Sequence, residues 1–551
     1  MKRAAVILVL AALAFASTAA PRRAPAAESA ATAEPAAAEE IVEIVEIVEI
    51  VEIVEPASTE AGLQLVYRPP AAESGEPPRK AGRALLEYSA LLIYENYQYW
   101  AAAGFVEDWQ FKLTWEDQKR RLLELEGVRF DSNGYAINWT HAYAGAVYYS
   151  LGRVNNLGVG ESFLLAAFES LYWEAVVEWR EVFSVNDTIV TDFGALSIGE
   201  PWFQLSRYLV TRQNPAANVL GFIHPVLGLH SVFDRASLPR PTPSQTLPGH
   251  GVYLSVGAAT TDSPYASDSG GFASLGLRSR LALAPGYTAP GTERWQGWEV
   301  LSSTFNLNAD FEGATARELD VDSGAVFYGS VERRVGGDSR GSGSLFGVGS
   351  AFTLFRKAPV TDYDAGRVRV RLDELDLEDP RDFRDKYTIV HLLGPVYEGY
   401  WRGADAEVAW GLEAYPDFAL VNSYALNEYS AGHDISGMKT TQLYYGYYYG
   451  YGLSLKARLE ARLGPVAVGT AASVHYHESI EGLDRYEDEL AGDPHATDTW
   501  YRFDVRLGWP IPGTPVAVEA TARWSNRRGS LGGTTVQGSE SRYSLGLTWR
   551  L

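Results

Sequence analysis

Acidic side chains set into an apolar, helix-like stretch are the part of the sequence best suited to chemistry. Glu174 and Glu178 lie four residues apart within residues 160–183, a spacing that places both carboxylates on one side of a helix. His141 precedes this stretch and Asp187 follows it. A buried carboxylate with a raised pKa can work with a histidine as general acid and base, and His with Glu can bind a hard or borderline metal ion. We therefore predict these four residues as candidate catalytic residues, with the metal left open.

A structural interpretation of the same residues competes with the catalytic one. Buried acids are costly unless they are paired or protonated, so a polar network could fix the packing of helices, with Arg153 and Arg180 as counter-ions. The sequence favours this network over catalysis and leaves ligand binding as a third reading, because perturbed acids mark functional sites only statistically. The residues predicted for the network are Asn138, Arg153, Ser170, Arg180, Asn186 and Glu200.

Composition and missing motifs narrow the function classes. The chain contains no G-x-S-x-G, no P-loop and no H-E-x-x-H, and its nine histidines show no ligand spacing. The absence of cysteine excludes disulfides, thiolate metal sites, cysteine nucleophiles and a lipidated cysteine. A net charge of −22 argues against a nucleic-acid partner. Whether the protein is an enzyme, and with which cofactor, stays open.

The first part of the chain has the features of an export signal and a spacer. Lys2 and Arg3 precede a short apolar run, and the A-x-A pattern at 14–16 is typical of signal cleavage. Residues 1–16 are thus predicted as a signal peptide, and 17–80, rich in Ala, Pro and Glu, as a disordered linker. The Ile-Val-Glu repeat at Ile41–Glu55 fits neither a strand nor a helix period, and we interpret it as low-complexity sequence rather than a pairing segment.

Helical periodicity dominates the region after the linker. Residues 83–103 carry apolar side chains at helical intervals. A second helix is expected from about Trp139, where small residues at 142–146 let another backbone approach closely. A buried helix is expected over 160–183, because its large apolar side chains cover more than one face. These elements predict a helical domain at residues 81–245.

From about Gly251 the pattern changes to period two. Apolar residues alternate with polar or charged ones in runs close to the length of a transmembrane strand, and aromatic residues gather near the run ends. Polar loops are expected at Asp310–Ser323 and Ser479–Thr499. The clearest runs are Tyr451–Leu463, Tyr501–Trp509, Val516–Trp524 and Tyr543–Leu551, with less regular ones at Val252–Ala258, Leu275–Leu283, Phe346–Leu354 and Val408–Leu412.

These runs predict a transmembrane antiparallel up-and-down β-barrel of about 12 strands at residues 246–551, following the α-helical domain. A soluble β-sandwich also has alternating strands, but the export signal, the long strands and the apolar final strand favour the barrel. Inner-face charges such as Arg458 with Glu460 and Arg502 with Asp504 can pair across neighbouring strands. Such pairs predict a narrow or closed lumen.

A series of short motifs carries a family resemblance. It comprises F-D-x-N from Phe130, N-x-x-H-x-Y-x-G-x-x-Y-Y from Asn138, E-S-L-Y-W-E-x-x-x-E, S-V-N-D and G-x-x-x-x-G-E, with a closing segment from Asn214. This order, over about residues 130–230, resembles the bacterial envelope family of domain of unknown function 3943. The chain departs from it at Ala142, where the family has Pro, and at Leu229-His230, where it tends to have Asn-Arg. The resemblance implies an exported barrel with a helical N-terminal part and implies no reaction.

Together these features predict a bacterial outer-membrane protein whose helical domain is periplasmic or sits inside the barrel mouth. The expected partners are the outer-membrane lipid bilayer and, as a candidate ligand, a lipid or glycan. The favoured function is a structural or ligand-passing role in the cell envelope. The alternatives are an envelope hydrolase acting on lipid or glycan through the His/Glu/Asp site, and a channel. Substrate and oligomeric state are left open.

Overall fold

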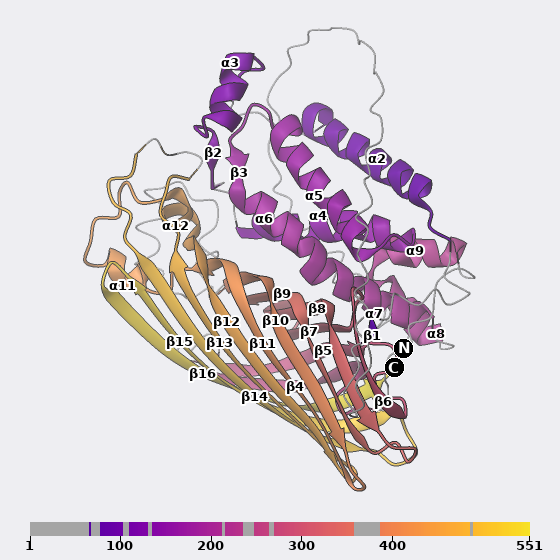
Figure 1. Cartoon of the computed structure of the whole chain (residues 1–551). Coiled ribbons are helices and arrows are strands. Elements are labelled where there is room, and N and C mark those ends of the chain that lie inside the picture. Colours follow the sequence, from indigo (N-terminus) through magenta and orange to yellow (C-terminus); the bar gives the residue numbers. More distant parts are fainter. Residues whose placement is uncertain are drawn as a thin grey trace, which may run out of the picture.

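The protein consists of a helical part lying against a barrel of long strands (Figure 1). The structure, a computed structural model, describes residues 66–67, 78–102, 110–130, 135–211, 215–234, 247–263, 269–357, 386–484, 487 and 489–551. The expected signal peptide and the Ile-Val-Glu repeat lie outside these residues. None of the helices in the described ranges is long and apolar enough to span a membrane.

The helical part contains short helices joined by tight turns and two short strands. Its elements are α2 (Ala81–Tyr97), η1 (Gln98–Ala102), α3 (Trp115–Gln118), η2 (Lys119–Leu123), β2 (Val128–Arg129), α4 (Tyr135–Val154), α5 (Val159–Tyr172), η3 (Trp173–Val177), β3 (Phe183–Ser184), α6 (Val185–Gly194), η4 (Ala195–Gly199), α7 (Glu200–Val210), α8 (Pro215–Leu220), η5 (Gly221–Ile223) and α9 (Pro225–Phe233). The single helix expected over 160–183 is therefore α5 followed by η3, which ends at Val177.

The barrel is closed and antiparallel, as the sequence predicts. The strands are β4 (Gly251–Asp262), β5 (Gly270–Ala282), β6 (Gly291–Gly297), β7 (Ser302–Glu312), β8 (Thr315–Val335), β9 (Gly341–Lys357), β10 (Lys386–Arg402), β11 (Ala406–Asn422), β12 (Tyr447–Leu463), β13 (Val466–Ser479), β14 (Ala496–Pro510), β15 (Val516–Leu531) and β16 (Thr534–Arg550). Twelve of them form a ring in chain order, which closes where β16 pairs with β4.

Two features complete the sheet. The short strand β6 pairs with the end of β8 beyond the reach of β7, so it continues the line of β7. The two-residue strand β1 (Val66–Tyr67) adds to β6 in parallel. Between β11 and β12 the chain forms α11 (Leu426–Ser430) and α12 (Thr440–Tyr445).

Small residues set the packing of α4 against α6, as the sequence predicts. A Cβ added to Gly145 would lie 1.9 Å from the carbonyl oxygen of Thr191, and one added to Gly194 would lie 2.6 Å from Ala142. Only glycine therefore allows the two backbones to approach so closely. Ser184 begins α6, because its hydroxyl accepts a hydrogen bond from the amide of Asp187 at 3.2 Å.

Neighbouring residues of β8 show on which side of the wall the helices lie. Asp320 and Asp322 line the lumen, so the alternating residues Val321 and Ser323 point outward. The Ser323 hydroxyl donates a hydrogen bond of 2.6 Å to the carbonyl of Ser197 in η4. Val321 shares an apolar core with residues from the helical part and from the outer faces of other strands, namely Ala142, Val190, Ile198, Phe352, Leu354, Val390, Phe418, Leu420, Tyr447 and Tyr449.

The sequence left the helical domain either periplasmic or inside the barrel mouth, and the described helices contact the outer face of the wall. The helices pack on the outer face of the wall, because that face offers apolar side chains on β7 to β12 while the inner face is charged. Two further apolar clusters extend the contact. One joins Tyr148 and Leu196 to Phe327, and the other joins Leu205 to Leu277.

Replacing Gly145 by Ala should destabilise the α4–α6 contact by about 1–3 kcal/mol, because the new methyl group forces the backbones apart. The matched control is Gly82→Ala at the start of α2, where an added Cβ meets nothing within 4 Å. Urea unfolding in detergent, followed by the helical circular dichroism signal, measures the free energy of unfolding of both variants. Equal stability of the two variants would contradict the close approach.

Candidate functional site

The lumen is filled with charged side chains that pair across it. Arg502 on β14 lies 2.8 Å from Asp320 on β8, and β14 is six places from β8 in either direction around the ring. Arg523 on β15 reaches the same Asp320 at 2.8 Å and Glu318 at 3.0 Å. Asp504 accepts from both arginines. Ion pairs thus join opposite walls of the barrel.

Further pairs extend this network along the barrel. Arg278 of β5 meets Glu519 of β15 at 3.2 Å, and Arg542 of β16 meets Asp310 of β7 at 2.7 Å. Arg458 bonds to both Glu413 and Glu398. The expected Arg502–Asp504 pair is present within β14, at 2.7 Å. Arg458 and Glu460 instead bind other partners; Glu460 binds Arg506 at 2.5 Å.

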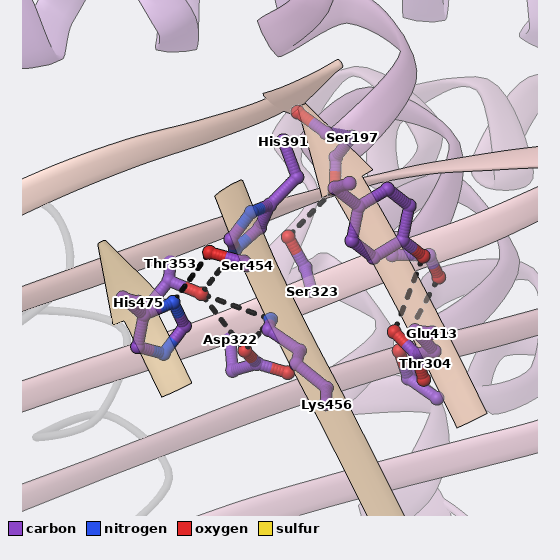
Figure 2. Close-up of polar contacts among 12 residues, drawn as sticks. Ser197, Thr304, Asp322, Ser323, Thr353, His391, Glu413, Ser454, Lys456 and His475 are labelled. Carbon is purple, nitrogen blue, oxygen red and sulfur yellow. Dashed lines mark hydrogen bonds and ion pairs between the residues drawn. The ribbon is translucent and has the colours of Figure 1, made fainter. Parts of the chain in front are cut away.

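Figure 2 shows two histidines of the lumen, His391 and His475, beside Thr353, Ser454 and Lys456. The histidines gather around Asp417. Its carboxylate lies 2.6 Å from His391 Nδ1 and 3.1 Å from His477 Nε2. The Ser454 hydroxyl bonds to Asp417 and lies 2.6 Å from His475 Nδ1. A serine beside a histidine can be a nucleophile with its base, but here the same hydroxyl is bound to a carboxylate. The cluster is a closed hydrogen-bond network.

A lysine and a threonine connect this cluster to Asp322 on β8. Thr353 Oγ1 lies 2.9 Å from His391 Nε2 and 3.0 Å from Lys456 Nζ, and Lys456 pairs with Asp322 at 2.5 Å. No group of three or more His, Asp or Glu in the described part of the chain is arranged to hold a metal ion. The sequence analysis missed this cluster. The available signal was that His475 and His477 occupy alternate positions of one strand.

A cavity of about 310 Å³ remains between the charged layers. Both signs of charge line it, with Arg280, Lys456 and Arg506 beside Glu413 and Glu460. This volume is at the lower end of the range for small-molecule sites. The residues of the cross-lumen pairs, among them Asp320, Arg502 and Arg523, are part of its lining.

In the helical part, the structure brings together two of the four predicted catalytic residues. His141 Nδ1 lies 3.1 Å from Asp187 Oδ1, and the His141 side chain is 25% exposed. Asn186 donates to the same oxygen of Asp187 at 2.9 Å. Glu174 is buried and accepts a hydrogen bond of 2.6 Å from the amide of Ser184. A histidine oriented by a carboxylate is suited to general-base chemistry.

Glu178 and Arg180 have other partners. Glu178 accepts a hydrogen bond of 2.8 Å from the indole N–H of Trp173. The Arg180 guanidinium lies over the ring of Trp179, 4.5 Å from its centroid. The cation buried beneath η3 is Arg121, which donates to the carbonyls of four residues, Glu174, Ala175, Glu178 and Glu181. This role of Arg121 could not be recognised from the sequence, because Arg121 belongs to a strongly charged stretch.

Glu200 and Arg153 form a buried ion pair. Arg153 donates to the two carboxylate oxygens at 2.7 and 3.1 Å. Tyr149 and Gln204 each add a hydrogen bond of 2.5 Å to this carboxylate. Burial lowers the pKa of Arg153, but the Glu200 charge outweighs it and holds that pKa above the usual value. The arrangement fits the predicted packing network. Asn138 belongs to α4, and its side chain lies outside the described part.

Acids that the sequence analysis did not select lie beneath α2 and α5. Burial raises the pKa of Asp192 to about 6, while a hydrogen bond from Ser170 lowers it. Burial, with the neighbouring charges of Glu95 and Asp192, raises the pKa of Glu169 well above its usual value. Glu95 accepts from the Tyr148 hydroxyl. The raised pKa of Glu169 favours its uncharged form, which lowers the cost of burying it.

Comparison with known proteins supports the resemblance found in the sequence. The sequence model of the domain of unknown function DUF3943 matches residues 127–226, which confirms the expected likeness over this region. No curated protein matches the chain.

Solved outer-membrane barrels are similar to the strand region at low scores. A bacterial polysaccharide outer membrane secretin is 10% identical, with 55% of this chain and 99% of that chain covered and a TM-score of 0.19. The translocator domain of autotransporter NalP from Neisseria meningitidis is 11% identical, with 55% and 89% covered and a TM-score of 0.19. The CymD monoaromatic hydrocarbon channel is 8% identical, with 58% and 92% covered and a TM-score of 0.18. The closed antiparallel ring of twelve strands shows that the chain contains an outer-membrane-type barrel.

The Glu200→Ala variant should lose about 3–5 kcal/mol of stability, because it leaves the buried Arg153 charge without its partner. The control is Glu161→Ala. Its pair with Arg79 is exposed and should contribute less than about 1 kcal/mol, and its hydrogen bond from the Gly158 amide at the start of α5 should add about 1 kcal/mol. Urea unfolding in detergent compares them. A loss at Glu200 no larger than at Glu161 would contradict the buried pair.

Proposed function

We propose that the protein is a sealed outer-membrane barrel with a structural role in the cell envelope, in which the helical domain forms a second layer on one side of the wall. The observation that carries this proposal is the set of ion pairs between opposite strands. Arg502 and Arg523 bind acids of β8 across the full width of the ring. Such pairs are costly to separate in a low-dielectric interior, since each partner would be left as an unpaired charge.

The connections between strands suggest an orientation. Connections of two to five residues join β8 to β9, β10 to β11, β12 to β13 and β14 to β15, at the end where both termini of the barrel lie. Two-residue turns also join β7 to β8 and β15 to β16 at the opposite end. Longer connections join β11 to β12 and β13 to β14 at the opposite end. Short turns face the periplasm in bacterial barrels, so the first end is assigned to the periplasm.

With this orientation, the helical domain lies beside the barrel wall and not only at its periplasmic end. Leu205 and Leu209 share a core with Val252, at the end assigned to the periplasm. Phe130 stacks on Phe418 and Tyr449 near the other end. The domain therefore follows the wall over much of its height. Binding of a small polar ligand inside the lumen is compatible with this role, because the cavity of about 310 Å³ is lined by charges of both signs.

A second candidate is the envelope hydrolase, which the His141–Asp187 pair favours. In this case His141→Ala and Asp187→Asn would each abolish hydrolysis of a fluorogenic lipid or glycan ester, whereas Glu161→Ala would leave it unchanged. Absence of hydrolysis by the wild-type protein would remove this candidate.

The wild-type barrel should give no steady current in a planar lipid bilayer. The double variant Arg502→Ala with Arg523→Ala should conduct, because it removes the two arginines that join opposite walls. The control is Arg317→Ala, whose pair with Glu312 lies at the exposed β7–β8 hairpin. A steady wild-type current, or a double variant that stays closed although folded, would contradict the sealed lumen.

A further inference from the structure

The outer face of the barrel carries an apolar band that extends over β4 and over β9 to β16 and is missing from β5, β7 and β8 among the described residues. Large exposed apolar side chains point outward from β12, β14 and β16. Aromatic residues bound this band at one edge, as in lipid-facing girdles. The members on these strands are Tyr451, Leu453, Leu455, Leu459, Leu463, Tyr501, Phe503, Leu507, Trp509, Tyr543, Leu545 and Leu547.

The band stops where the helices begin. Among the described residues, the large exposed apolar side chains include none from β5, β7 or β8. The outer faces of these strands are buried under α4, η4 and α7, through contacts such as Phe327 with Leu196 and Phe305 with Leu205. On this side of the barrel, helices thus cover the strands that would otherwise face lipid. A lipid bilayer around the barrel would therefore contact the outer helices and not the strands.

That next layer, α2 and α5, is apolar on its exposed side. On α2, the exposed positions from Leu85 to Ala101 carry no charge. The same holds on α5 and η3 beyond Glu161. The large exposed members are Leu85, Leu86, Ile93, Tyr94, Tyr97 and Trp100 on α2 and η1, with Leu164, Phe168, Leu171 and Val176 on α5 and η3. A solvated helix face normally carries charged residues.

Polar and aromatic groups mark the two ends of this face. At its start, Arg83 pairs with Glu87 at 2.8 Å and with Asp234 at 2.5 Å. At its end, Trp100 stacks on Trp179 with centroids 6.1 Å apart. From Leu85 to Trp100 the helix rises about 22 Å at 1.5 Å per residue, close to the roughly 25 Å height of an outer-membrane apolar band. Charges and tryptophans at the ends suit the two membrane interfaces.

We propose that this face of α2 and α5 contacts the acyl chains of the bilayer and continues the lipid-facing band around the side where helices cover the wall. The inference rests on the proposed membrane position of the barrel. It makes the helical domain an integral part of the membrane-embedded surface, in which α2 and η1 lie along the barrel wall over most of the height of the band, although no described helix is long and apolar enough to span a membrane by itself.

The chain contains no cysteine, so single cysteines can be introduced and labelled with the fluorophore NBD in the otherwise unchanged full-length protein. Ile93→Cys and Phe168→Cys report on the helical face. Leu455→Cys on β12 is the matched lipid-facing control, and Glu116→Cys on α3 is the water-facing control. In proteoliposomes, doxyl-labelled phospholipids quench probes in the acyl region and iodide quenches probes in water.

The probes at Ile93 and Phe168 should lose as much fluorescence to doxyl lipids as the probe at Leu455, and little to iodide. The probe at position 116 should lose fluorescence to iodide and little to doxyl lipids. Iodide quenching at both helical positions with normal lipid quenching at Leu455 would overturn this inference and leave the membrane barrel intact. Quenching by neither agent would also overturn it, because a protein segment would then cover the face. Failure of lipid quenching at Leu455 would instead contradict the proposed function.

Discussion

The pairing of inward-facing charges is the constraint on which the rest of this structure depends. A barrel strand places alternate residues in the lumen, and here many of them are charged. Leaving such charges unpaired in a confined interior costs several kcal/mol per ion. The arginines of β14 and β15 meet the acids of β8 on the far wall, so both walls are held close to each other. A narrow, chambered lumen follows from this geometry.

The same alternation determines where the helical domain binds. With the charges turned inward, the outer face of β7 to β12 offers apolar side chains, and the helices cover them. Close packing inside the helical part depends on glycines at the α4–α6 contact and on the Glu200–Arg153 pair. The acids set into this domain are therefore compatible with a packing role. The partly buried His141 beside Asp187 is the pair of side chains in this domain that is best suited to chemistry.

Much of the barrel could be predicted from period-two alternation, which is regular in β12 and in β14 to β16. The segment Asp310–Ser323 was expected to be a loop, but it contains the end of β7 and the start of β8. Its acids resemble loop residues because their partners, such as Arg542 and Arg523, lie more than 200 positions away along the chain. Local pattern cannot reveal such pairs. The position of the helices on the outer wall could not be predicted for the same reason. Small residues in a helix predict that another backbone packs closely, but they do not identify which segment of the chain it belongs to.

A double-mutant cycle on Arg502 and Asp320 tests the central claim most directly, because it measures the coupling between opposite walls. Stabilities of the wild type, Arg502→Ala, Asp320→Ala and the double variant would be compared by urea unfolding in lipid vesicles. The account predicts a coupling energy of at least about 0.5 kcal/mol, within the range found for residues in contact. Additive effects within the error of the cycle would show that the two walls do not interact and would contradict the sealed lumen.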